Sequence, residues 1–330
     1  MNPVAIAAGG GVLYWSSLVL TLGIAAWFAL SLALYRSDGG ERGALWVLFP
    51  IALWLSVLLS RFLHWYCHAE QYSGFFSAMT HYSSGGFCLP GVLLGVLLAA
   101  LLVRALGFAD SSARLLDAMA PGAALGIGLI RLSALFGNAD RGKLLITDPR
   151  FQYLPLAAPV TTATGAVEYR FAAFFWEFLL LMLLGLLMTR FFLKRRRAPM
   201  KEGKAEGSVA LLFLLFYSAI ELVLDSTRYD SSFLRSNGFV SLTQIVSAAA
   251  ILAVLLYYSR RSIRANGLRP VHFLLWLLWL LGLAAAGYLE YLIQRHGNWY
   301  LLCYSLMSLS AALMALSGYW MYRTLRRHRT

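Results

Sequence analysis

The residue in this sequence whose type and position most invite chemistry is Arg131. It lies inside the stretch PGAALGIGLIRLSALFGNADRG, residues 121–142. The apolar part of this stretch is long enough to cross a bilayer as a helix, which takes about 20 residues. An arginine at that depth is costly unless it is paired or faces water. Arg131 therefore marks either a functional interior or a structural ion pair between helices, and its partner decides between the two.

The composition is that of a polytopic membrane protein. The 330 residues are 60% hydrophobic and 13% charged, which lies far outside the usual range of soluble globular domains. The formal charge is +13, but the basic residues gather at the ends of apolar runs, as cytoplasmic loops require. We therefore expect no nucleic-acid partner. The first residues, MNPVAIAAGGG, lack the basic region of a cleaved signal peptide, so we expect them to stay in the mature chain.

The apolar runs predict an all-α fold of nine membrane-spanning helices. Their expected ranges are 12–35, 46–66, 86–107, 116–138, 171–193, 208–226, 240–258, 271–291 and 298–321. In this arrangement all the basic clusters fall on one side, which predicts an outer N-terminus and a cytoplasmic C-terminus.

The predicted spans divide the chain into a core and an addition. Residues 1–265 form a transmembrane core, in which the proline-containing segment 139–170 is expected to be an external arm or cap. Residues 266–330 add a two-helix hairpin and a basic cytoplasmic tail.

Polar side chains gather in the outer halves of the predicted helices. Tyr217, Glu221, Asp225 and Arg228 are spaced 4, 4 and 3 residues apart, so we expect them to stack along one face of the sixth span. The other polar residues at this depth are Arg61, His64, His68, Glu177 and Gln244. Together they predict a cavity that opens to the outer leaflet, in which Arg131 faces Glu177 or the acids of the sixth span.

Metal binding is the less favoured interpretation of the histidines. His64 and His68 have the spacing of a metal pair, but no glutamate lies between them and no third ligand is evident. Cys67, Cys88 and Cys303 have no metal-binding spacing and no disulfide pattern. We expect neither a metal nor a cofactor. Glycines 122, 126 and 128 are expected to allow close helix packing.

Several segments between about residues 12 and 260 resemble, in order, the motifs of a bacterial inner-membrane family, the prolipoprotein diacylglyceryl transferases. SRFLHWYCHAEQY resembles the family's arginine-containing segment before its first arm. GGFCLPGVLLG resembles GGLSFHGGLIGG, and IRLSALFGNADRG resembles RIGNFINGELYG. YRFAAFFWEFLL is similar to RHPSQLYEALLE, YSAIELVLDSTRYD to YGLFRFLVEFFREPD, and SLTQIVS to the SMGQ segment. The last two predicted spans exceed the family's usual seven.

The resemblance keeps part of the family's polar frame and loses another part. The residues that match are Arg131, Gly142, Glu177, Tyr217 and Arg228. The positions that differ are Pro90 for the histidine after GG, Ala134 for the asparagine, Ala139 for the glutamate beside Asp140, Phe171, Ala172, Ala173 and Phe174 for HPSQ, and Glu221 for an arginine.

In the family, as the resemblance implies, a lipobox cysteine thiol attacks the glycerol carbon of phosphatidylglycerol, and glycerol phosphate leaves. The reaction needs a base to form thiolate and positive groups to stabilise the departing phosphate. Arg131 and Arg61 are the residues that we expect to stabilise the departing phosphate. At the position of the family histidine this chain has Pro90, which cannot act as a base. We expect His81, on the loop before Gly85, to take the thiol proton instead, with Glu221 or Asp225 as alternatives.

These considerations define the expected site and partners. The catalytic residues expected are His81, Arg131, Tyr217 and Glu221. The substrate contacts expected are Arg61, Gly85, Gly86, Asn138, Gly142, Glu177, Asp225, Arg228 and Gln244. The expected partners are phosphatidylglycerol, or another anionic lipid, and a lipoprotein precursor peptide. The alternative functions are an inactive relative that binds such a lipid or precursor and, less favoured, a transporter.

Overall fold

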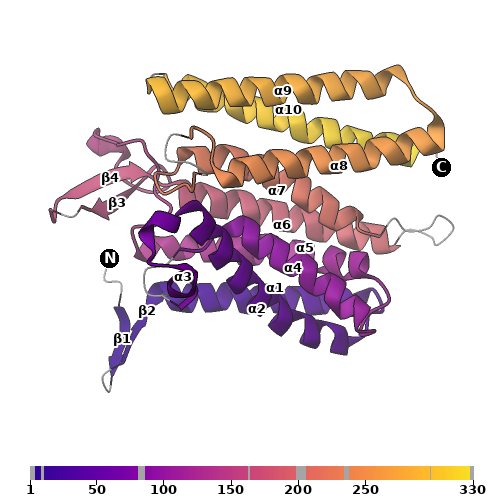
Figure 1. Cartoon of the computed structure of the whole chain (residues 1–330), viewed down its shortest axis with the longest axis horizontal. Helices are drawn as coiled ribbons and strands as arrows, with labels where there is room; N and C mark the ends of the chain where they lie inside the picture. Colours follow the sequence, from indigo (N-terminus) through magenta and orange to yellow (C-terminus); the bar gives the residue numbers. More distant parts are fainter. Residues whose placement is uncertain are drawn as a thin grey trace. The chain divides into compact units, whose positions relative to one another are not determined.

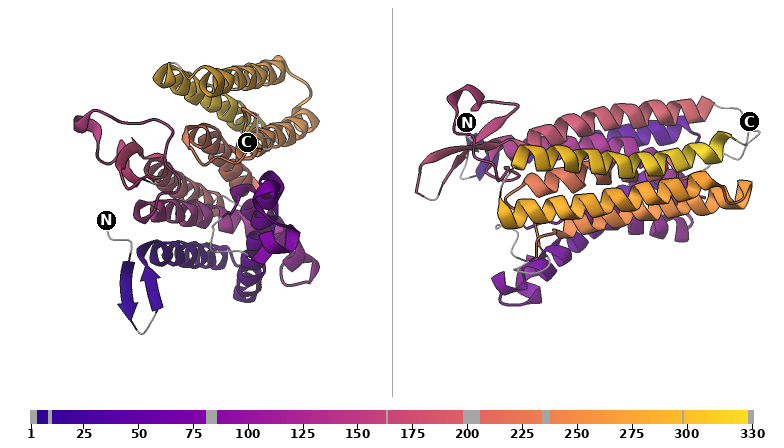
Figure 2. Two further views of the ribbon diagram at one scale, coloured as in Figure 1. Left: turned by 60° about the vertical axis from the view of Figure 1, so that its left-hand side comes forward. Right: turned by 90° about the horizontal axis from the view of Figure 1, so that it is seen from above.

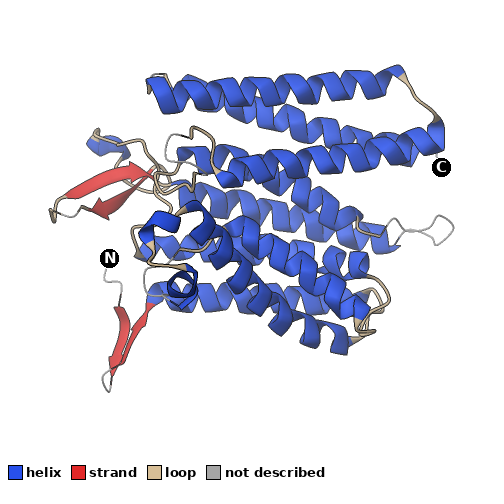
Figure 3. Ribbon diagram, in the orientation of Figure 1, coloured by secondary structure: helices blue, strands red, loops and turns tan. Residues whose placement is uncertain are grey.

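The computed structural model describes residues 4–8, 11–80, 86–162, 164–197, 206–233, 238–297 and 299–327. Over these residues helices dominate, and the strands form two antiparallel hairpins, as Figures 1 and 3 show. One hairpin pairs β1 (Val4–Ala8) with β2 (Gly11–Tyr14), and the other pairs β3 (Ala157–Thr161) with β4 (Val167–Phe171). The predicted all-α membrane fold is confirmed, with the second hairpin inside the segment that we expected to form an arm.

Each of the nine predicted ranges is occupied by a helix. These are α1 (Trp15–Ser37), α2 (Arg42–Cys67), α4 (Leu89–Ala105), α5 (Ser112–Leu132), α6 (Ala173–Arg197), α7 (Ser208–Thr227), α8 (Leu242–Asn266), α9 (Pro270–His296) and α10 (Tyr300–Arg327). Among the described residues, eight helices are long and apolar enough to cross a membrane, whereas α4 has 17 residues. At 1.5 Å per residue, α4 reaches about 26 Å, slightly less than the hydrocarbon core. The chain is a multi-pass membrane protein.

Short helical turns lie between the long helices. They are η1 (Ala69–Gln71), α3 (Phe75–Thr80), η3 (Ser133–Phe136) and η4 (Pro149–Phe151).

Local sequence explains where several long helices begin and end. Ser241 and Gln244 form a capping box at the start of α8, in which each side chain binds the other residue's backbone N–H. Proline in the first turn starts α4 and α9, where its missing N–H costs no helical hydrogen bond. Gly297 stops α9 in the left-handed conformation, with φ 64°.

The chain divides into two compact units. The first contains residues 1–42, 114–198 and 227–230, and the second contains residues 43–113, 199–226 and 231–330. The first unit therefore holds α1, α5, α6 and both strand hairpins. The second holds α2, α4 and α7 to α10.

In the first unit, α1 and α5 pack at a distance that only glycine allows. A Cβ atom on Gly126 would lie 2.8 Å from the Trp27 Cβ and 3.0 Å from the Gly23 carbonyl oxygen. A Cβ atom on Gly23 would lie 2.9 Å from the Gly126 carbonyl oxygen. These small residues bring the two backbones together, as is common for helices in lipid.

In the second unit, α10 of the added hairpin packs against both α9 and α8. Helices α9 and α10 run side by side in Figures 1 and 2. Glu290 of α9 is buried; its carboxylate accepts hydrogen bonds from the Ser226 hydroxyl of α7 and, at 2.7 Å, from the Gln294 amide. Tyr304 of α10 donates to the Ser226 carbonyl at 3.2 Å. The hairpin is thus fastened to the end of α7 by polar contacts.

We expect Gly126→Ala to lower the thermal unfolding midpoint of the purified protein, because the new methyl group would force α1 and α5 apart. Gly287→Ala in α9 is the matched control, since nothing lies within 4 Å of its added Cβ. That change should leave the midpoint unchanged or raise it, because alanine in a helix is more favourable than glycine by up to about 1 kcal/mol. Equal midpoints for the two variants would contradict the close packing of α1 on α5.

Candidate functional site

An ionic cluster in the first unit contains the arginine that the sequence singled out. Arg131 lies in the last turn of α5, and its Nε donates to Glu177 Oε1 at 2.8 Å. Its Nη1 donates to Asp140 Oδ1, also at 2.8 Å. The prediction that Arg131 faces Glu177 is confirmed. Asp140, in the loop after η3, is a second partner that we did not predict.

A second arginine completes the cluster. Arg228 donates from Nη2 to the other oxygen of Glu177, and its Nε lies 3.6 Å from Asp140 Oδ1. The Glu177 side chain is 0% exposed, and the Arg131 side chain is 15% exposed. A buried carboxylate thus bridges two guanidinium groups, and the second carboxylate balances the charge. Such pairing is what makes ionised groups tolerable at this depth.

Backbone pairing, rather than a helix, holds Arg228 in place. We predicted that Arg228 continues the polar face of the sixth span, but α7 ends at Thr227. Arg228 instead forms an antiparallel bridge with Gly142, and Lys143 N–H donates to the Thr227 carbonyl at 2.7 Å. The prediction was wrong because Arg228 has the sequence spacing of the helical face but lies one residue after the last residue of the helix.

Gly142 is needed for this pairing. Its N–H donates to the Phe171 carbonyl at 2.8 Å, and a Cβ atom at this position would lie 2.7 Å from the Phe171 Cβ. The predicted substrate contact of Gly142 stays a prediction. The structure gives this glycine a packing role, which is to let the loop approach the strand that leads into α6.

The loop that carries Asp140 is held by further polar contacts. Asp140 has a φ of 53°, uncommon for a residue other than glycine, and its N–H donates to Asp230 Oδ2 at 3.0 Å. Tyr229 donates from its hydroxyl to the Asn138 carbonyl at 3.0 Å. Asn138, predicted as a substrate contact, has an exposed side chain that donates to the Thr161 carbonyl at 3.4 Å. Desolvation by the surrounding protein, and then the charge of Asp140, raise the pKa of Asp230.

Arg141 is a buried cation that the sequence analysis did not single out. Its side chain donates from Nη2 to the Gly137 carbonyl at 2.7 Å, and its guanidinium carbon lies 4.5 Å from the centre of the Phe174 ring. Burial lowers the pKa of Arg141, while the charge of Asp140 opposes that shift. Its position in a polar loop gave no periodic signal that predicted burial.

In the second unit, Arg61 holds a turn of the backbone. Its guanidinium is buried and donates to the Ala78 carbonyl at 2.5 Å and the Gly86 carbonyl at 3.0 Å. Gly86 has a φ of 84°, and a Cβ atom there would lie 2.5 Å from Arg61 Nη1. Gly86 is therefore required for this contact, and a phosphate contact by Arg61 stays a prediction.

The polar row on α7 is buried and internally bonded. Tyr217 donates from its hydroxyl to Glu221 Oε1 at 2.8 Å, and Ser241 donates to the Asp225 carboxylate. Gln244, in the first turn of α8, donates to the Leu222 carbonyl at 3.3 Å. These three residues of α7 are therefore buried within the protein, and the cavity predicted around them stays a prediction.

Two predicted residues, His81 and Gly85, lie outside the described residues. Pro90, which the resemblance predicts to stand at the position of the family histidine, is buried in the first turn of α4 and has no ionisable group. His64 and His68 stack with ring centres 4.3 Å apart. Within the described ranges, no three histidine, cysteine or acidic side chains are grouped so that they could hold a metal ion.

Comparison with known proteins gives consistent matches. Residues 3–260 match the family described as prolipoprotein diacylglyceryl transferase. A phosphatidylglycerol–prolipoprotein diacylglyceryl transferase of Clostridium novyi (strain NT) is 24% identical over 270 residues, which cover 80% of this chain and 97% of that protein. One of Gloeobacter violaceus (strain ATCC 29082 / PCC 7421) is 29% identical over 275 residues, which cover 80% of this chain and 95% of that protein. Helices α9 and α10 lie beyond the family match.

We expect Glu177→Gln to destabilise the protein by about 3–5 kcal/mol, because it leaves two buried arginines without their shared counter-charge. Glu168→Gln is the matched control. Glu168 pairs with Arg170 at 2.9 Å, and the side chains are 37% and 25% exposed, so its loss should cost at most about 1 kcal/mol. Unfolding in detergent would measure both.

A double-mutant cycle tests the pair itself. Arg131→Ala and Glu177→Ala together should cost less than the sum of the two single changes, since each alone leaves a buried charge with fewer partners. Additive losses would contradict direct coupling.

Proposed function

Because this chain belongs to the prolipoprotein diacylglyceryl transferase family, we propose that it transfers the diacylglyceryl group of phosphatidylglycerol to the thiol of a lipobox cysteine. The observation that carries the proposal is the family match over residues 3–260, which includes every residue of the ionic cluster. The names of the matched relatives, which are phosphatidylglycerol–prolipoprotein diacylglyceryl transferases, support the same substrates.

In the proposed reaction, a carbon–sulfur bond forms at the carbon of the diacylglycerol part of the lipid that carries the phosphate. The carbon–oxygen bond to that phosphate breaks, and glycerol phosphate leaves with the bonding electrons. The thiol proton passes to a base. Negative charge therefore grows on the phosphate oxygens while the thiolate loses its charge, so fixed cations near the phosphate lower the barrier.

Arg131 is the proposed phosphate-binding residue. Glu177 and Asp140 fix its guanidinium in position, yet its side chain is three times as exposed as that of Arg228, at 15% against 5%. A cation that is oriented in advance and still accessible needs little rearrangement to contact a phosphate. We assign Arg228 and Glu177 to the support of this arginine, beside the substrate contacts predicted for them.

The base is proposed to be His81, since Pro90 has no proton acceptor in its side chain. A free cysteine is only a few per cent ionised at neutral pH, and histidine has the pKa suited to take its proton. Glu221 and Asp225 are the alternative bases, and Tyr217 is the hydrogen-bonding partner of Glu221, as the bond between them supports. The remaining predicted contacts, Arg61, Gly85, Gly86, Asn138, Gly142, Asp225 and Gln244, are proposed to bind or shape the substrate site.

A transfer assay tests the function. Purified protein is given phosphatidylglycerol and a lipobox peptide, and mass spectrometry measures the diacylglyceryl adduct. We expect Arg131→Ala to lower the rate by 100-fold or more, by analogy with the loss of one stabilising donor, and His81→Ala to lower it by at least 100-fold.

The control variants separate the possible outcomes. Arg150→Ala, which changes an exposed arginine in η4, should leave the rate unchanged. An adduct that is indifferent to His81 but lost with Glu221→Gln would move the base to Glu221. Tight lipid binding with no adduct under any condition would exclude the transferase and leave a lipid-binding relative.

The proposed location is the bacterial cytoplasmic membrane, with the N-terminus outside and the C-terminus in the cytoplasm. The basic residues at the end of α6 and just before α7, at the end of α8, and at the end of α10 support this orientation. Reporter fusions after Gly203 and Asn266 should therefore report the cytoplasm, and fusions near Pro155 and Ser232 the outside. One reversed result would overturn the orientation.

A further inference from the structure

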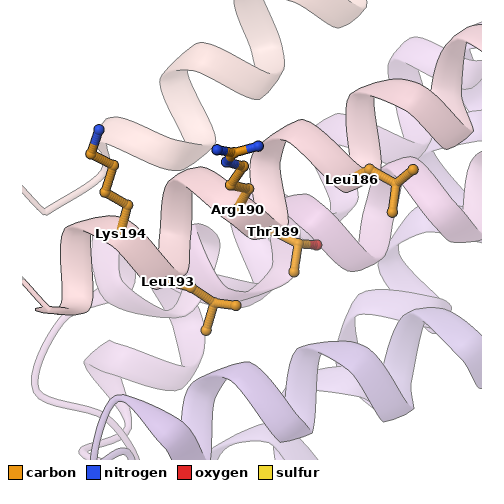
Figure 4. Close-up of a pocket in the computed structure, with 5 residues that line it drawn as sticks. All are labelled: Leu186, Thr189, Arg190, Leu193 and Lys194. Atoms are coloured by element: carbon orange, nitrogen blue, oxygen red, sulfur yellow. The ribbon is translucent and has the colours of Figure 1, made fainter.

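A basic hollow lies at the C-terminal end of α6, far from the ionic cluster. It has a volume of about 530 Å³ and is lined by Leu186, Thr189, Arg190, Leu193 and Lys194, which are labelled in Figure 4. Arg190 follows Glu177 by 13 residues on the same helix. At 1.5 Å per residue, the two positions are about 20 Å apart along the helix axis, so the hollow and the cluster belong to opposite leaflets.

The two cations of the hollow act together. Arg190 and Lys194 are four residues apart on α6, and Figure 4 shows both side chains extending to the same side of the helix. Both side chains are exposed. Like charges at this spacing repel each other, and a bound anion between them would remove that repulsion.

These cations differ from their neighbour Arg195. Arg195 is bonded to the buried carboxylate of Asp117 in α5, so its charge is already balanced. The side chains of Arg190 and Lys194 are both exposed, so a ligand can reach the positive charge of the hollow.

The rest of the hollow is apolar. Leu186 is 71% exposed, Leu193 is half-buried, and the Thr189 hydroxyl is occupied by the Gly185 carbonyl at 2.8 Å. Leu186 lies one helical turn deeper in the membrane-spanning segment than Arg190. A ligand that fits this order carries a negative group at the level of Arg190 and an apolar chain at the level of Leu186.

We propose that this hollow binds the headgroup of an anionic phospholipid in the leaflet opposite to the ionic cluster, with an acyl chain along Leu186. A phosphate diester supplies the negative charge, and basic pockets at membrane-helix ends bind such headgroups. This site does not deliver substrate, because it lies about 20 Å along α6 from the level of the proposed reaction. The proposal does not depend on transferase activity.

A second basic hollow, on α8, is the weaker candidate. It is lined by Ala253, Leu256, Tyr257, Arg260, Arg261 and Arg264. There, Arg261 already donates to the Tyr257 hydroxyl of its own helix at 2.9 Å, so part of its hydrogen-bonding capacity is used.

The test measures binding of phosphatidylserine, an anionic lipid other than the proposed substrate. Native mass spectrometry of the full chain in detergent would give its affinity, with phosphatidylcholine as the neutral comparison. Removal of one membrane-surface cation weakens anionic lipid binding by about fivefold, so Arg190→Gln and Lys194→Gln together should weaken it by about 25-fold. A photoactivatable phosphatidylserine should label α6 near residues 186–194.

Arg196→Gln is the matched control, because Arg196 is an exposed cation of the same helix end that does not line the hollow. It should change the affinity less than twofold. A loss equal to that of Arg190→Gln would overturn the proposal in favour of general charge attraction. Displacement of the lipid by millimolar inorganic phosphate would show that free phosphate is the ligand. Unchanged thermal midpoints in the Arg190 and Lys194 variants would confirm that folding is intact.

Discussion

The buried carboxylate of Glu177 is the constraint on which the first unit depends. It must be ionised to hold two arginines, and an ionised group at this depth is stable only where both cations reach it. Arg131 arrives from α5, Glu177 from α6, and Arg228 from the segment after α7. The positions of these three elements are therefore linked, since displacement of any one would leave a charge uncompensated.

The charges alone could not hold this arrangement, and the backbone supplies the frame. Arg228 is a long, flexible side chain, so its main chain must be fixed before its guanidinium can be. The bridge to Gly142 and the Lys143–Thr227 hydrogen bond do this. Gly142 in turn can approach Phe171 only because it lacks a side chain. One glycine thus contributes to an ionic cluster without touching any charge.

The sequence predicted the helices and one ion pair because both follow from strong physical costs. Long apolar runs in a lipid-embedded chain have few alternatives to helices. Arg131 within such a run needed a partner or water, and Glu177 was one of the partners expected. The other cluster members depend on loops. Asp140 reaches Arg131 from a backbone with a φ of 53°, and Arg228 lies just beyond the end of α7, where helical periodicity no longer applies. Neither the left-handed residue nor the bridge to Gly142 leaves a periodic signal in the sequence. The starts of α4, α8 and α9 do have signals in the sequence that our prediction did not use, namely proline and the Ser241–Gln244 capping box.

The resemblance to the family predicts Pro90 at the position of a histidine, and this difference affects one half of the proposed chemistry and leaves the other. In the proposed mechanism, stabilisation of the departing phosphate depends on fixed cations, and the Arg131 cluster would supply these together with their counter-charges. Formation of the thiolate depends on a proton acceptor, and Pro90 is a buried helix-starting residue that cannot supply one. Loss of the base is less damaging than loss of the cations. A thiol has a pKa of about 8.5, so a small fraction is ionised at neutral pH without any base. The charge on the leaving phosphate, in contrast, has nothing to stabilise it once the cations are removed. In the proposed mechanism, a chain can move or lose its base and keep some transfer, but it needs the arginine cluster, and the structure shows this cluster assembled.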